Sequence, residues 1–296
     1  MYKISVLDYR FDSVTKSQVQ ELAKNKVKFW EDRCPLDERI SRTGDSEVAL
    51  ITPWEKIDKE YLDACPNLKY IGLCGTSTAN IDLDELEKRG IEFSNIVTHT
   101  PKIAVAEFFF MQLVRLARGS GKYQWKNGEE HTLIGKNLGI IGLGDVGQGF
   151  AHIALAYNMN VSYFSPNRKK DWEKKGLKYL EKDELLSSNE IIVLCSPSNV
   201  EVIGKAEFEA IQQGSIIVQA CSGSPFDKPA FKNWVKKDGN FALFDMSASE
   251  KNYQLHKDLP GVIFSWQVAG DTYESNQRRG KRAIKNLKSF IQQNPS

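Results

Sequence analysis

The fold is decided by residues 137–147, NLGIIGLGDVG. The first part, Leu138–Ile141, has the continuous apolar character of a buried parallel strand. Three glycines then follow at the G-x-G-x-x-G spacing: Gly142, Gly144 and Gly147. In a turn of this kind the first glycine allows a tight turn and the second lets the backbone approach a pyrophosphate. The third lets the following helix pack closely on the strand.

The helix predicted after this turn runs from Val146 to Tyr157, and a second strand, Val161–Phe164, completes a βαβ unit. The helix N-terminus, at Asp145 and Val146, would face an anion. The alternative is a glycine turn with a purely structural role. We favour dinucleotide binding because a strand precedes the motif, a helix follows it, and the second strand lies at the expected distance.

Composition excludes several classes of function. The chain has 296 residues, which is enough for two domains that each have a sizeable core. Its 40 basic and 38 acidic residues give a formal charge of +2, so no strong field points to nucleic acid or a membrane surface. The five cysteines show no C-x-x-C spacing, which indicates a reducing compartment and no metal site. The first residues predict a strand rather than a signal peptide, and we expect a cytoplasmic protein.

The first part of the chain alternates strand and helix patterns. The predicted strands are Lys3–Leu7, Val27–Trp30, Val48–Thr52, Tyr70–Leu73 and Ile91–Ser94. The predicted helices are Ser13–Lys24, Ile57–Ala64 and Leu83–Arg89. This alternation predicts a small parallel α/β domain whose ligand edge includes the loop Cys74–Ala79.

A long apolar helix, Lys102–Arg118, follows, with Thr100 as the expected N-cap and Pro101 at the first helical position. It is apolar almost all round, so it is buried either in the domain core or in a subunit interface, and we favour the interface.

Beyond the glycine turn the alternation continues and predicts a doubly wound sheet of about six strands. The strands after the first are Val161–Phe164, Ile191–Leu194, Ser215–Gln219, Phe241–Phe244 and Val262–Phe264. The basic amphipathic helix Tyr273–Gln293 is expected to pack back on the first domain.

Ordered matches along nearly the whole chain resemble the D-isomer-specific 2-hydroxyacid dehydrogenase family. The matching residues are Leu68–Gly72 with Gly75 and Asn80–Asp82, Val105–Glu107, Trp125, Leu133–Lys136, Glu201 and Gly204 after Pro197, and Gly214 with Asp227. The resemblance implies a Rossmann doubly wound sheet in residues 100–270. It also implies a smaller, flavodoxin-like α/β substrate-binding domain made of residues 1–99 and 271–296. Homodimers through the Rossmann domain, and hydride transfer between a nicotinamide and a 2-oxo or 2-hydroxy acid, are further implications.

The family uses an arginine to bind the substrate and a histidine–glutamate pair for acid/base work. Ser222 stands where the arginine is expected, and Gln267 stands where the histidine is expected, while Glu250 keeps the glutamate. A charge-assisted arginine–carboxylate contact stabilises by on the order of 1.5–3 kcal/mol, and a serine cannot reproduce its fork. Acid/base transfer contributes roughly 10²–10⁴-fold, and a glutamine amide does not titrate. We therefore do not expect a conventional 2-oxo acid reduction.

Other residues are further candidates for the site. Without its histidine, Glu250 is either a protonatable carboxyl in a closing cleft or a leftover surface acid. The loop Gly75, Thr76 and Ser77 resembles the family's backbone anchor for the substrate carboxylate, although Ser77 and Ala79 stand where the family has Gly and Asp. His99 and Lys102 are the nearest replacements for an acid and an anion anchor, and the alternative for His99 is a solvent-facing loop residue. The remaining histidines, in a linker, a helix and a polar loop, are not expected to act: His131, His152 and His256.

The cofactor is predicted to be NADP(H) rather than NAD(H). An NAD site keeps an acid after the second strand for the ribose 2′-hydroxyl, and Ser165 stands at that position. The missing carboxylate removes repulsion from a 2′-phosphate, with which Arg168 and Lys169, beside Asn167, could pair. The alternative is that these residues only begin a basic helix. The cofactor set also includes residues after the next strands: Cys195, Pro197, Ala220 and Asp245.

Two functional hypotheses follow. The first is an NADP(H)-dependent reductase of a small carbonyl or imine, because a protonated imine arrives activated and needs no histidine acid. The alternative is a catalytically silent NADP(H)-binding protein that acts through a partner surface, which the joint loss at Ser222 and Gln267 favours.

Overall fold

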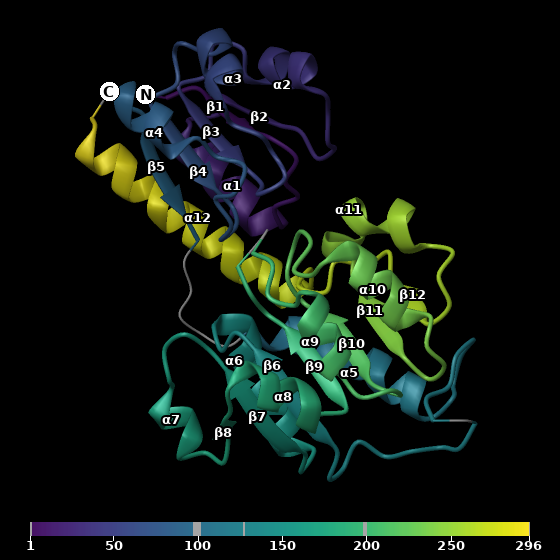
Figure 1. The fold of residues 1–296 in the computed structure, drawn as a ribbon. Helices are drawn as coiled ribbons and strands as arrows, with labels where there is room; N and C mark the ends of the chain where they lie inside the picture. The colour runs from purple at the N-terminus through teal and green to yellow at the C-terminus, as the bar shows by residue number, and fades with distance from the viewer. Residues whose placement is uncertain (1, 97–101, 127, 198–199, 296) are drawn as a thin grey trace. The chain divides into compact units, whose positions relative to one another are not determined.

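The computed structural model describes residues 2–96, 102–126, 128–197 and 200–295, and for residues 249–251 it describes the backbone but not the side chains. The chain forms two compact units (Figure 1). The first is Met1–Thr98 together with Tyr273–Ser296, and the second is His99–Thr272. Each unit is built on its own parallel sheet, which confirms the predicted fold class.

The first unit contains a five-stranded parallel sheet in the order β2-β1-β3-β4-β5. Its strands are β1 (Ile4–Val6), β2 (Val27–Phe29), β3 (Val48–Ile51), β4 (Tyr70–Leu73) and β5 (Glu92–Asn95). Its helices are α1 (Ser13–Leu22), α2 (Leu36–Thr43), α3 (Lys59–Ala64), α4 (Leu83–Lys88) and α12 (Tyr273–Gln293). The strand order 2-1-3-4-5 is the flavodoxin-like one.

Helices cover both faces of this sheet. Helices α1 and α12 share a core with β1, β3 and β4, whereas α2, α3 and α4 share a core with the opposite face. In α12, drawn in yellow in Figure 1, the predicted apolar stripe is buried at Ile284 and Leu287. Helices α1 and α12 pack closely, because a Cβ on Gly280 would lie 2.5 Å from Thr15 Oγ1. The C-terminal helix therefore completes the core of the N-terminal unit.

The second unit contains a seven-stranded parallel sheet in the order β12-β11-β10-β9-β6-β7-β8. Its strands are β6 (Asn137–Ile141), β7 (Asn160–Phe164), β8 (Lys178–Tyr179), β9 (Ile191–Leu194), β10 (Ile216–Gln219), β11 (Phe241–Phe244) and β12 (Val262–Phe264). Its helices are α5 (Ile103–Ala117), α6 (Asp145–Ala156), α7 (Lys170–Glu173), α8 (Lys182–Ser188), α9 (Lys205–Ala210), α10 (Lys228–Val235) and α11 (Met246–His256).

The central strands of this sheet are buried on both faces. Helices α5 and α6 share one core with the sheet, and α8, α9, α10 and α11 share the other. The central strands β9 and β10 are buried at every residue, which explains their continuous apolar sequences. Trp125 is fully buried and donates its indole N–H to the Gly214 carbonyl at 2.6 Å, which fixes the segment between α5 and β6.

Two elements escaped the sequence prediction. The sheet has seven strands rather than about six, because the two-residue β8 is too short to show a period. Helix α2 was also missed, since it has few apolar residues and is stabilised largely by ion pairs between side chains. Its Arg42 pairs with Glu38 and Asp32, and its Arg39 pairs with the buried Glu55.

Two local predictions need correction. Helix α5 begins at Ile103 with Lys102 as its N-cap residue, rather than at Thr100 and Pro101, which lie outside the described residues. His256 is not in a polar loop: it is the last residue of α11 and is 1% exposed. Among the described residues no helix, including the apolar α5, has the length and hydropathy needed to cross a membrane.

Candidate functional site

The glycine turn between β6 and α6 is imposed by close contacts. Gly142 has a φ of +95°, and a Cβ there would lie 2.6 Å from the Cys195 carbonyl oxygen. A Cβ on Gly147 would lie 2.1 Å from the Gly142 carbonyl oxygen. A Cβ on Gly144 would meet no atom within 4 Å. The first and third glycines are thus required by the protein itself, whereas the space beside the second is open.

The amino end of α6 is suited to an anion. Gly144 is its N-cap residue, and no described side chain caps the helix, so the first backbone N–H groups keep their capacity to bind a ligand. The chain entering α5 packs against this helix. The Lys102 backbone N–H donates to the Asp145 carbonyl at 2.8 Å, and a Cβ on Gly149 would lie 2.6 Å from the Lys102 carbonyl oxygen. Lys102 therefore lies in the second unit, beside the glycine turn.

The turn lies at the switch point of the sheet. The chain runs from β6 to β7 and β8 on one side, and from β9 to β12 on the other, so the order reverses between β6 and β9. In open α/β sheets ligands bind outside the carboxyl ends of the strands at such a point. Cys195 follows β9 there, and its N–H donates to the Ile141 carbonyl at 2.8 Å. Cys195 and Ala220, which follows β10, are half-buried, and Pro197 is exposed.

The end of β7 carries the residues predicted to distinguish the two nicotinamide cofactors. Ser165 is 9% exposed, Asn167 and Arg168 are exposed, and Lys169 is half-buried. The Lys169 backbone N–H donates to the Tyr163 hydroxyl at 2.7 Å, which fixes the start of this loop.

Arg168 already has partners inside the protein. Its Nε and Nη2 donate to the two oxygens of Glu173 at 3.1 and 2.6 Å. Its guanidinium also lies over the Tyr179 ring, 4.7 Å from the centroid. The Arg168 contact holds the pKa of Glu173 below its usual value. A 2′-phosphate would have to share this guanidinium with Glu173.

The loop after β10 is held by side-chain hydrogen bonds. Gln219 is 0% exposed, and its Nε2 donates to the carbonyls of Cys221 at 3.0 Å and Gly223 at 2.8 Å. Between them lies Ser222, which is half-buried. Burial raises the pKa of the Cys221 thiol to about 11, and its Sγ lies 3.7 Å from Ser196 Oγ. Ser222 thus lies between two backbone carbonyls held by Gln219 and follows a buried, weakly acidic thiol.

Asp245 connects the end of β11 to the segment after β12. It is 4% exposed and caps α11 by accepting from the Ala248 N–H at 3.0 Å through Oδ1. Its Oδ2 accepts from the Ala269 N–H at 3.0 Å. The Met246 N–H donates to the Gln267 carbonyl at 3.0 Å. Gln267 itself is exposed, and Asp245 is committed to the fold through both of its carboxylate oxygens.

Of the predicted site residues, Glu250 is described only in its backbone and His99 is not among the described residues. Glu250 belongs to the α11 backbone, but its side chain is not among the described ones. His99 lies outside the described residues altogether. Among the described residues no group of histidine, cysteine or acidic side chains could hold a metal ion.

The loop after β4 belongs to the first unit. A Cβ on Gly75 would lie 2.1 Å from the Pro53 side chain, so this position requires glycine. Its carbonyl accepts from the Ile96 N–H at 2.9 Å, and the Thr76 carbonyl accepts from Asn95 Nδ2 at 3.3 Å. Ser77 is half-buried. The loop is therefore braced by the strand beside it.

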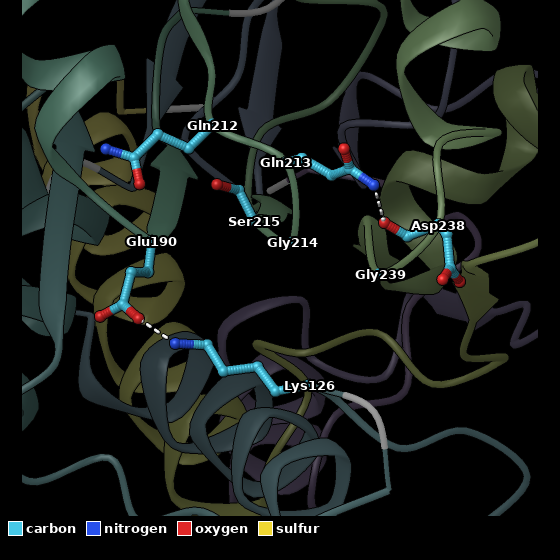
Figure 2. A pocket seen from close by; sticks show the side chains of 8 residues that line it. All are labelled: Lys126, Glu190, Gln212, Gln213, Gly214, Ser215, Asp238 and Gly239. Atoms are coloured by element: carbon cyan, nitrogen blue, oxygen red, sulfur yellow. Dashed lines mark hydrogen bonds and ion pairs between the residues drawn. The ribbon is translucent and has the colours of Figure 1, made fainter.

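A surface pocket in the second unit contains none of the predicted site residues (Figure 2). It lies where β9, β10 and β11 begin, which is the edge opposite to the glycine turn. Its lining residues are Lys126, Glu190, Gln212, Gln213, Gly214, Ser215, Asp238 and Gly239. Figure 2 shows Lys126 paired with Glu190 and Gln213 bonded to Asp238, so its polar groups largely satisfy one another.

Gln219 and Asn252, which hold the loop around Ser222, were not among the predicted site residues. Asn252 is 0% exposed, and its Nδ2 donates to the Gly223 carbonyl at 3.0 Å and the Ala248 carbonyl at 2.9 Å. The available signal was a glutamine that ends a buried apolar strand. Nothing in the sequence connects it to Asn252.

The switch point, the glycine turn and the open amino end of α6 define an NAD(P)-binding α/β protein. Residues 109–265 match the family model described as "D-isomer specific 2-hydroxyacid dehydrogenase, NAD binding domain". This span is more than half of the 296-residue chain. The chain belongs to the D-isomer specific 2-hydroxyacid dehydrogenase family.

Individual relatives agree with this assignment. The chain is 30% identical over 302 residues to the glyoxylate reductase of Thermococcus litoralis, covering 90% of this chain and 87% of that one. The structure of D-lactate dehydrogenase from Escherichia coli superposes with a TM-score of 0.80 at 19% identity, covering 98% of this chain and 96% of that one. An acyclic imino acid reductase in complex with NADPH and D-Arg superposes with a TM-score of 0.79 at 23% identity, covering 99% and 98%. The protein is an NAD(P)-dependent oxidoreductase of the D-2-hydroxyacid dehydrogenase type, whose ligands are a nucleotide cofactor and a small substrate.

Proposed function

We propose that the protein transfers hydride from NADPH to a small carbonyl or imine substrate that is not a conventional 2-oxo acid. The observation that carries the proposal is a well-formed glycine turn at the same sheet edge, the carboxyl ends of the strands, as Ser222 and Gln267. Neither side chain titrates, so neither can act as the acid that a neutral ketone needs on reduction.

The residues at this edge would bind and orient the substrate. NADPH supplies the hydride when it is bound at the open amino end of α6. The Ser222 hydroxyl and the Gln267 amide can each donate a hydrogen bond to the substrate, and Glu250 provides a carboxyl that can carry a proton. A protonated imine accepts hydride at carbon and becomes an amine without a further proton, which removes the need for a histidine. The imino acid reductase among the structural relatives was solved with NADPH and D-Arg, which supports this class of substrate.

NADPH is proposed over NADH because of the end of β7. Ser165 places no carboxylate near the ribose 2′ position, and Arg168 and Lys169 follow within four residues. A guanidinium can bind phosphate through two parallel hydrogen bonds. We assign residues 1–99 and 271–296 to substrate binding, with Gly75, Thr76 and Ser77 offering backbone groups to an anion, and residues 100–270 to the cofactor.

We also propose a homodimer through the second unit. On the apolar helix α5, Met111 is 45% exposed, and Tyr157, the C-cap residue of the neighbouring α6, is 40% exposed. The buried Phe110 of α5 contacts Tyr157 with ring centroids 5.4 Å apart, so the end of α6 packs against the apolar helix α5. Light scattering coupled to gel filtration should give twice the mass of the 33.5 kDa chain. All five cysteines are free, so we place the protein in a reducing, cytoplasmic compartment.

The test is a fluorescence titration with NADPH and NADH, followed by an absorbance screen of NADPH consumption against small carbonyls and amine–carbonyl mixtures that form imines. We expect tighter NADPH binding and turnover with an imine. Tight NADPH binding without turnover of any compound would instead support the catalytically silent alternative.

The double change Ser222→Arg with Gln267→His sharpens the result. Gained activity on glyoxylate would show that the pocket is otherwise that of the family and that its former chemistry was lost. No gain would indicate a pocket remodelled around a different substrate.

A further inference from the structure

The carbonyl of Gly223 is held by two buried amides that come from different elements. Gln219 Nε2, at the end of β10, donates to it at 2.8 Å, and Asn252 Nδ2, on α11, donates to it at 3.0 Å. Gln219 also donates to the Cys221 carbonyl at 3.0 Å. The peptide that precedes Ser222 and the Gly223–Ser224 peptide are therefore both hydrogen-bonded to buried side chains.

Asn252 also connects this loop to the other candidate positions. Its helix, α11, carries Glu250 two residues earlier and begins at Met246, whose N–H donates to the Gln267 carbonyl. Asn252 Nδ2 is bonded within the helix as well, to the Ala248 carbonyl at 2.9 Å. Asn252 thus links the loop that contains Ser222 to the helix that carries Glu250, and the first residue of that helix is bonded to the Gln267 carbonyl.

These amides are expensive to bury. Gln219 Oε1 and Asn252 Oδ1 have no hydrogen-bond partner among the described residues, although both side chains are 0% exposed. An unsatisfied buried acceptor destabilises the folded state, and an apolar side chain of similar size would avoid that cost. The bonds that these two amides make to the loop backbone therefore point to a role in loop geometry rather than in stability.

We propose that Asn252 and Gln219 are positioning residues that hold the Cys221–Gly223 backbone, and Ser222 with it, in the geometry that substrate binding requires. The inference rests on the proposed function, because it assigns Ser222 to the substrate. It adds two residues that touch neither substrate nor cofactor and that act through a backbone carbonyl.

The first measurement is the rate at which a maleimide labels Cys221, followed by peptide mass spectrometry. Cys221 is 8% exposed in the held loop. In Asn252→Leu, and in Gln219→Met should the first variant not fold, the loop opens more often. We expect Cys221 labelling to rise about tenfold or more. Cys65 and Cys74, buried in the first unit, serve as internal references that should not change.

The matched control is Asn240→Leu. Asn240 is 2% exposed and is likewise a buried amide with three bonds, accepting from the Gly214 and Ser215 N–H groups and donating to the Trp234 carbonyl. It lies at the opposite edge of the same sheet. Its replacement should lower stability at least as much as Asn252→Leu, because its oxygen is satisfied, while leaving Cys221 labelling and turnover unchanged.

The second measurement is steady-state kinetics on the imine or carbonyl found by screening. Misplacing the loop by a fraction of an ångström should lower kcat by roughly ten- to a hundredfold, while the Kd for NADPH stays within about twofold, because the glycine turn is untouched. Unchanged Cys221 labelling in both variants, or a loosened loop with unchanged kcat, overturns the positioning inference. A wild-type protein that turns over no compound overturns the proposed function, and labelling then still decides whether the amides hold the loop.

Discussion

The turn after β6 and the loop after β10 leave the same edge of the seven-stranded sheet, but different forces hold them. At the turn, backbone packs on backbone, since Gly142 faces the Cys195 carbonyl and Gly147 faces the Gly142 carbonyl. At the loop, Gln219 and Asn252 reach in from the core and bind backbone carbonyls.

The difference bears on how each part can change. A turn fixed by such close backbone contacts accepts almost no substitution at Gly142 or Gly147. A loop fixed by buried amides can keep its backbone path while the side chain at its centre changes. On the proposed assignment of Ser222 to the family's arginine position, such a loop would accept the new side chain without a change in its backbone path, and the glycine turn would be unaffected.

The largest effect is expected from a substitution of Gly147 in the glycine turn. In Gly147→Ala the new methyl would lie 2.1 Å from the Gly142 carbonyl oxygen, so β6 and α6 must separate. Overpacking typically costs about 1–3 kcal/mol, and a clash this close with backbone lies at the upper end of that range, so we expect a large drop in the urea midpoint together with loss of NADPH binding. Gly144→Ala is the control, because its methyl meets no protein atom within 4 Å. It should leave the urea midpoint unchanged and weaken only NADPH binding; equal destabilisation of both variants would contradict the steric account.

The next largest effect concerns His256, at the end of α11. It is 1% exposed, its ring lies 4.8 Å from that of Phe231, and neither ring nitrogen has a partner among the described residues. Burial, with Lys232 and Lys228 nearby, lowers its pKa to about 4. The unfolded chain binds the proton near pH 6.5 and the folded chain only near pH 4, so stability is complete above pH 6.5 and falls as the pH drops through this window.

By pH 5 the loss from His256 should reach about 2 kcal/mol. Urea unfolding of wild type and His256→Leu at pH 7.5 and pH 5 isolates this contribution from that of the carboxylates. The variant should lose less stability on acidification than wild type. Parallel losses in the two proteins would mean that the imidazole is not buried in its neutral form.

Sequence reasoning recovered the parts of the molecule that local chemistry determines. The glycine spacing predicted the turn, and the apolar runs predicted the strands β9, β10 and β11 at nearly their observed bounds. It failed where the stabilising partner is distant in the chain. Asn252 lies 29 residues from Gly223, and Arg39 of α2 pairs with Glu55, so no local period marks either contact. His256 was misplaced because its charged and polar neighbours in sequence, Lys257 and Gln254, conceal a buried helix end.

A substitution of Asp245, whose hydrogen bonds hold the segment after β12, should have a smaller effect on stability. Asp245→Asn keeps the size of the side chain but replaces one charged acceptor with a donor, which faces either the Ala248 or the Ala269 N–H. Loss of a hydrogen bond to a charged group costs about 1.5 kcal/mol, and the segment that carries Gln267 should exchange its amide hydrogens faster. Hydrogen-exchange mass spectrometry should place the change in residues 265–271 and at the start of α11. Faster exchange spread evenly over the second unit would argue against a specific role of Asp245 in holding residues 265–271.

The smallest expected effect lies at the cofactor end, where Arg168 is shared. Glu173 occupies the Nε–Nη2 edge of its guanidinium, so a 2′-phosphate must compete with an internal carboxylate for that edge. Glu173→Gln weakens this competition without changing shape, and NADPH should bind about threefold more tightly, because an ion pair whose arginine is exposed contributes little. Arg168→Ala should weaken NADPH by about tenfold and leave NADH unchanged, since only the phosphate contact is lost. Fluorescence titration of both nucleotides measures each effect, with Lys174→Ala as the matched control because Lys174 is 81% exposed and pairs only loosely with Asp171 at 3.8 Å. An equal loss of NADH affinity in Arg168→Ala would show that the arginine supports the loop rather than the phosphate, and NADPH selectivity would then have to come from Ser165 or Lys169.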